Sequence, residues 1–101
     1  MSGSFSRVYK AATDMHKKSA HFTSPSSMRA LPEFKKLVEI GRKSSEAISS
    51  MFTLIHYLPL EAMLALTDIL GACPIKKKNR GNVDEMKHDW IRYGKKKGYI
   101  S

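Results

Sequence analysis

The side chains in this sequence that could do chemistry are mostly cations, and they gather in the last quarter of the chain. Nine of them form two lysine-rich runs with a helical stretch between the runs: Lys76, Lys77, Lys78, Arg80, Lys87, Arg92, Lys95, Lys96 and Lys97. Lysine and arginine side chains on loops around a helix suit phosphate binding, because each can neutralise a phosphate and release its counterion. The pattern predicts a polyanion-binding segment over residues 76–97, and a solvated basic face is the alternative.

Three aromatic residues lie among these cations, at Trp90, Tyr93 and Tyr99. Such side chains can stack on exposed bases or anchor a protein partner. Trp90 and Tyr93 are also three residues apart, which is the spacing of the inward stripe of a helix. The sequence leaves both roles open and favours the core for Trp90 and Tyr93.

Residues typical of catalytic and metal sites are present, but not at the spacing those sites need. The histidines show no metal-ligand spacing: His16, His21, His56 and His88. Cys73 has no base beside it in the sequence, and an inert thiol is the simpler interpretation. Asp84, Glu85 and Asp89 fall near the start of an expected helix, where acidic residues interact well with the helix dipole. We therefore predict a protein that is not an enzyme and uses no metal or cofactor.

The net charge of +9 on 101 residues is unevenly distributed along the chain. Residues 1–30 carry a net +4, residues 31–73 a net −1 and residues 74–101 a net +6. The nearly neutral middle is rich in leucine, isoleucine and methionine, which predicts a structural core with a basic C-terminal segment attached.

Length and composition exclude several classes of protein. A chain of 101 residues accommodates a single domain, and one cysteine excludes an internal disulfide. No apolar run approaches the roughly 18 residues of a membrane span, and the first residues lack the apolar core of a secretion signal. We expect one domain over residues 1–101, no membrane association, and a cytoplasmic or nucleoid-associated location.

The elements that position the cations are predicted to be helices. Apolar residues at spacings of three and four predict helices over residues 5–18, 33–57, 60–70 and 82–93. The second stretch is either one kinked helix or two helices, and the whole is all-α with four or five helices. No alternating stretch is long enough for a sheet.

Capping residues mark where these helices begin and end. Ser4 is an expected N-cap, and Asn82 followed by Glu85 reads as a capping box. Gly71 and Gly94 are expected to end helices. Residues 23–27 form a loop by composition, and residues 1–4 and 95–101 are expected to be flexible.

The order of elements near the C-terminus resembles that of a winged-helix module. A buried helix, a connection and an amphipathic helix are followed by Gly94 and the lysines 95–97, as a recognition helix is followed by its wing. The resemblance implies that residues 82–93 enter the major groove while residues 95–97 grip phosphates. It is a likeness of element order, since the connection over residues 72–81 has ten residues.

These observations favour a small nucleic-acid-binding protein, DNA-binding and regulatory, that uses the nine cations on phosphates. The alternative is an adaptor or inhibitor that binds an acidic surface of a larger protein, and a ribonucleoprotein component is a third option. The apolar excess over residues 48–70 is expected to be buried within the monomer, although part of it could form a homodimer interface.

Overall fold

The computed structural model describes residues 3–19 and 25–100. Its helices follow the apolar stripes of the sequence, and several begin at a proline or end at a glycine. The α-helices are α1 (Gly3–Ser19), α2 (Pro25–Arg29), α3 (Pro32–Lys43), α4 (Ser45–Leu54), α5 (Pro59–Leu70) and α6 (Val83–Lys97), with a 3₁₀ turn η1 (Lys77–Asn79) before α6. The described residues contain no strand, so the all-α prediction is confirmed. None of these helices is long and apolar enough to cross a bilayer.

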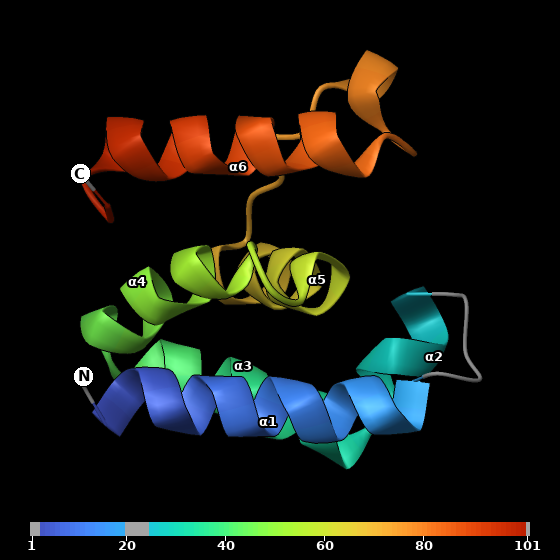
Figure 1. Cartoon of the computed structure of the whole chain (residues 1–101), viewed down its shortest axis with the longest axis vertical. Coiled ribbons are helices and arrows are strands. Elements are labelled where there is room, and N and C mark those ends of the chain that lie inside the picture. The colour runs from blue at the N-terminus through green and yellow to red at the C-terminus, as the bar shows by residue number, and fades with distance from the viewer. Residues whose placement is uncertain (1–2, 20–24, 101) are drawn as a thin grey trace.

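The helices form three layers (Figure 1). In this view α1 and α3 lie at one end of the long axis, α4 and α5 in the middle and α6 at the other end. Helices α1 and α3 pack on each other and on the middle layer, and α6 packs on α5 and α4. This arrangement places the basic C-terminal helix and the N-terminal helix on opposite sides of the molecule.

Local sequence explains most helix boundaries. Pro32 and Pro59 stand at the first positions of α3 and α5, where a missing N–H costs nothing. Gly71 adopts φ 65°, the left-handed conformation expected of a helix-ending glycine. The predicted long helix over residues 33–57 is two helices, because Ser44 is extended and its Oγ accepts a hydrogen bond from the Ala47 N–H at 3.4 Å.

The short helix α2 and the 3₁₀ turn η1 were not predicted. The described part of the chain has six α-helices rather than four or five, because α2 forms partly over residues predicted as a loop, while the division of the 33–57 stretch is one of the two predicted alternatives. Pro25 supplies the first turn of α2, in keeping with its preset φ. Ser4, expected as an N-cap, lies inside α1. Residues 1–2, 101 and the first part of the predicted loop lie outside the described residues.

The prediction that Gly94 ends the last helix is wrong. Gly94 is helical and buried, and a Cβ built there would lie 2.7 Å from Cε1 of Phe52. The missing side chain therefore lets α6 approach α4 closely, and the helix continues to Gly98, which has φ 84°. Lysines 95–97 consequently form the last turn of α6 rather than a wing, and the structure does not confirm the winged-helix resemblance.

The segment after α6 is packed rather than free over its described residues. The ring of Tyr99 stacks on Phe52 with centroids 5.7 Å apart, and the Tyr99 carbonyl accepts a hydrogen bond from Ser49 Oγ at 2.7 Å. Ile100 packs against the core. These contacts replace the flexible tail predicted for residues 95–101.

The apolar excess over residues 48–70 mostly enters the core. Six of its large apolar side chains are buried: Met51, Phe52, Leu54, Ile55, Met63 and Leu66. Tyr57 and Leu60 remain 62% and 52% exposed. Burial within the monomer therefore accounts for most of this surface.

Candidate polyanion-binding surface

Helix α6 is positioned by its cap and by its buried side. The Asn82 Oδ1 accepts a hydrogen bond from the Glu85 N–H at 3.3 Å, which confirms Asn82 as the N-cap. Asp89, Trp90 and Gly94 are buried, and they mark the sides of α6 that face the body and the preceding loop. A helix advances about 100° per residue, so Arg92 and Lys95 project away from these sides, whereas Lys87 and Lys96 lie about 20° around the helix from Gly94 and Asp89.

The basic loop before α6 is tied to the helix by the Asp89 carboxylate. Asp89 is 7% exposed, and its Oδ2 accepts hydrogen bonds from the Lys76 N–H at 3.0 Å and the Asn79 Nδ2 at 2.9 Å. These bonds favour the charged carboxylate and hold the pKa of Asp89 below its ordinary value of 3.8, the bond from Asn79 contributing most. In Figure 1 the η1 turn lies on the side of α6 that faces away from α5. The carboxylate thus fixes the first lysine run against α6.

This tie predicts a pH-dependent contribution of Asp89 to stability. The pKa is lower in the folded protein than the ordinary 3.8, so the stabilisation is complete well above pH 3.8 and is lost as pH falls through the lowered value. The difference in free energy of unfolding between the wild type and Asp89→Asn should be constant from about pH 7 to 5 and shrink below about pH 4. Urea denaturation across pH measures it.

The control for this prediction is Asp84→Asn, which removes the same charge from an exposed position in the first turn of α6. Amide exchange at Lys76 should accelerate in Asp89→Asn and stay unchanged in the control. Equal Lys76 exchange in wild type and Asp89→Asn would contradict the tie.

The nine predicted cations lie at the surface and make no ion pair within the described residues. Lys87 is half-buried and the other eight are exposed. Within the described residues, none of the nine has a carboxylate oxygen within 4.0 Å, since the ion pairs found there involve other cations. No close ion pair therefore neutralises these cations in the described chain, although the Asp89 carboxylate attracts Lys76 and Arg92.

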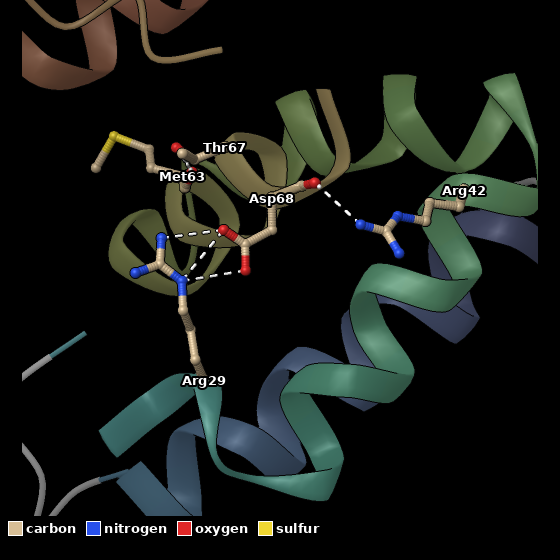
Figure 2. Close-up of polar contacts among 5 residues, drawn as sticks. All are labelled: Arg29, Arg42, Met63, Thr67 and Asp68. Carbon is tan, nitrogen blue, oxygen red and sulfur yellow. Dashed lines mark hydrogen bonds and ion pairs between the residues drawn. The ribbon is translucent and has the colours of Figure 1, made fainter. Parts of the chain in front are cut away.

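Four cations on the rest of the fold, Lys18, Arg29, Arg42 and Lys43, are used differently. The guanidinium of Arg29 binds the Asp68 carboxylate, with Nη2 to Oδ1 at 3.0 Å, and joins α2 to α5 (Figure 2). The Nη2 of Arg42 donates a hydrogen bond to the Asp68 carbonyl oxygen at 3.3 Å, which joins α3 to the last turn of α5. Lys18 and Lys43 pair with Glu33 and Glu39. The unpaired cations of residues 76–97 contrast with these structural uses.

An open groove of about 640 Å³ runs along one side of α6. Its lining residues come from α6 and the turn between α4 and α5: His56, Asp84, Lys87, His88, Ile91, Arg92 and Lys95. Ile91 gives the groove an apolar patch, and the three cations give it a positive edge. The position of His56 in this groove could not be predicted from the sequence, because the turn that carries it is far from α6 along the chain.

The predicted aromatic anchors lie in or against the core. Trp90 is fully buried and meets Phe52 edge-on at 6.1 Å between centroids, which confirms the core interpretation. Tyr93 and Tyr99 are half-buried, and Tyr99 stacks on Phe52. Lys97 Nζ lies 5.9 Å from the centre of the Tyr93 ring. Trp90 therefore offers no free ring face to a base or to a protein partner.

No group of three or more histidine, cysteine, aspartate or glutamate side chains that could hold a metal ion occurs in the described residues. Cys73 is a free, exposed thiol. Comparisons with protein-family models, curated proteins and solved structures find no match. Charge and geometry are therefore the observations that bear on the function of this chain.

The acidic residues of α6 restrict how a polyanion can approach it. Asp84 and Glu85 occupy the first turn, where their charges offset the positive end of the helix dipole. They would repel a phosphate at that end. Lysines 95–97 occupy the last turn, so the favourable approach is along the C-terminal half of α6 and across the 76–80 loop.

Proposed function

We propose that this chain is a non-catalytic nucleic-acid-binding protein with a regulatory role, which holds the phosphate backbone of duplex DNA on α6 and the 76–80 loop. The observation that carries the proposal is the set of nine cations without ion pairs in the described chain. Unpaired surface cations repel one another, and a polyanion relieves that repulsion while releasing its own counterions.

The extent of the surface favours a long polyanion over a single phosphate. Helix α6 has 15 residues and is therefore about 22 Å long. Each strand of a DNA duplex carries one phosphate per about 3.4 Å of the duplex axis, so a stretch of duplex as long as α6 carries about six phosphates on each strand. A single nucleotide could occupy only part of this surface.

The residue types favour contacts to the backbone over readout of bases. Seven of the nine cations are lysines, which act as point charges on flexible stems, and two are arginines. The described outward side of α6 carries no asparagine or glutamine, the usual partners of adenine. We therefore expect weak sequence preference, with binding dominated by phosphates.

A salt titration tests the proposed function. Fluorescence anisotropy of a labelled duplex should show log K falling against log salt with a slope of about −5, as expected for roughly six phosphate contacts. A flat response, or no binding at low salt, would contradict the proposal.

Competitors separate duplex DNA from the alternative ligands. Unlabelled duplex should displace the probe better than RNA or polyglutamate, which carries the carboxylates of an acidic protein surface without phosphates. Stronger displacement by polyglutamate than by duplex would instead support an acidic protein partner.

A further inference from the structure

The fold divides the charge into two separate basic layers. Helices α1 and α3 together carry eight lysine and arginine residues against three acidic ones, a net charge of +5. Helices α4 and α5 carry three acidic residues and no lysine or arginine. Residues 71–100 carry a net +6. A layer without cations therefore separates two cationic layers.

The α1–α3 layer has a groove of its own, with a volume of about 580 Å³. Its lining residues are Arg7, Lys10, Ala11, Asp14, Lys36, Glu39, Ile40 and Lys43. Lys43 Nζ pairs with Glu39 Oε1 at 2.9 Å, and this pairing lowers the pKa of Glu39. Arg7, Lys10 and Lys36 are exposed and make no ion pair within the described residues.

The cations of this groove lie on sides of α1 and α3 other than those that carry the buried core residues. Val8, Ala12 and Met15 point from α1 into the core, and the groove cations Arg7 and Lys10 lie on another side of the same helix. The groove is lined from α1 and α3, the two helices at the end of the long axis opposite α6 (Figure 1).

The separation of the two surfaces can be estimated from helix packing. Packed helix axes lie 8–10 Å apart, so two layer spacings place α6 roughly 16–20 Å from the α1–α3 layer. Side chains on both outer surfaces extend beyond the axes, in a molecule whose Cα atoms extend 32 Å along the longest axis.

We propose that one molecule bridges two nucleic-acid duplexes, one held by α6 with the 76–80 loop and the other by Arg7, Lys10 and Lys36 in the α1–α3 groove. The inference rests on the proposed function. DNA has a persistence length of about 150 bp, and bending even 20–30 bp by 40–90° costs about 1–6 kcal/mol. A single duplex would have to turn back around the protein to reach both surfaces. A second duplex reaches the free surface without bending.

A capture assay tests the bridging of two duplexes. One duplex of about 20 bp, far below the persistence length, is immobilised, and a second carries a fluorophore. Wild-type protein should retain the labelled duplex on the immobilised one. The triple variant Arg7→Gln, Lys10→Gln, Lys36→Gln should still bind the immobilised duplex and should capture at least tenfold less labelled duplex, because three phosphate contacts are removed.

The reciprocal variant Lys95→Gln, Lys96→Gln, Lys97→Gln distinguishes bridging by one molecule from bridging by a dimer. Each variant keeps one intact surface, so an equal mixture of the two should capture no more labelled duplex than either alone. Capture restored by mixing would show that two chains cooperate and would overturn the proposal.

The remaining outcomes separate the bridging proposal from the proposed function. Wild-type protein that binds the immobilised duplex and captures no second duplex overturns bridging alone. Undiminished capture by the Arg7, Lys10 and Lys36 variant also overturns it. Failure of the wild type to bind the immobilised duplex at low salt overturns both.

Discussion

Replacing Trp90 by alanine is expected to lower the free energy of unfolding by about 3–5 kcal/mol, the range for deleting a large buried aromatic side chain. Trp90 is fully buried and lies on α6, the helix at one end of the long axis of the molecule. Its ring contacts Phe52 of α4 edge-on at 6.1 Å and Tyr93 at 5.7 Å between centroids. Because small domains have about 5–15 kcal/mol of stability, the loss should be a large share of the total. Urea denaturation followed by circular dichroism measures it.

Trp90→Phe is the matched control for this prediction. The buried Nε1 of Trp90 has no hydrogen-bond acceptor among the described residues, so replacing the indole by a phenyl ring breaks no hydrogen bond. The phenylalanine variant should therefore lose clearly less stability than the alanine variant, chiefly through the smaller ring volume. An alanine variant within about 1 kcal/mol of the wild type would show that α6 does not depend on this contact.

The contact matters for function because Phe52 lies between two rings from the C-terminal segment. Trp90 meets it edge-on and Tyr99 stacks on it, while Gly94 leaves room for the ring. These contacts hold the helix that carries Lys87, Arg92 and the last-turn lysines. Loss of this packing would release the candidate surface from the rest of the fold.

Features that depend on neighbouring residues could be predicted from the sequence. The cap at Asn82 and the helix end at Gly71 depend on local backbone chemistry, and the structure confirms both predictions. The surface position of the nine cations also follows from residue type, because lysine and arginine are rarely buried.

Features that depend on distant residues could not be predicted. The sequence predicts a helix end at Gly94, because nothing near it in the chain shows that Phe52 fills the space beside it. Asp89 reads as one of several acids near a helix start, yet its carboxylate holds the basic loop. Counting charge along the chain groups α3 with α4 and α5, whereas packing places α3 beside α1. The second basic layer appears only with that packing.

The triple variant Lys95→Gln, Lys96→Gln, Lys97→Gln is expected to weaken duplex binding by roughly 100-fold or more at 0.1 M salt. Each phosphate contact contributes about 0.9 to the slope of log K against log salt, so the slope should change from about −5 to between about −2 and −3. Glutamine keeps a similar length and a good helix propensity, which should leave α6 intact. Anisotropy titrations at several salt concentrations measure both quantities, and circular dichroism checks the fold.

The variant Arg7→Gln, Lys10→Gln, Lys36→Gln provides the matched control, because it removes the same three charges from the opposite end of the molecule. If binding depends on the α6 surface, the affinity of this control for the first duplex should stay within a few-fold of that of the wild type. If binding depends only on net charge, the two variants should weaken it equally. The comparison therefore tests whether the position of the charge determines function, since both variants have the same net charge.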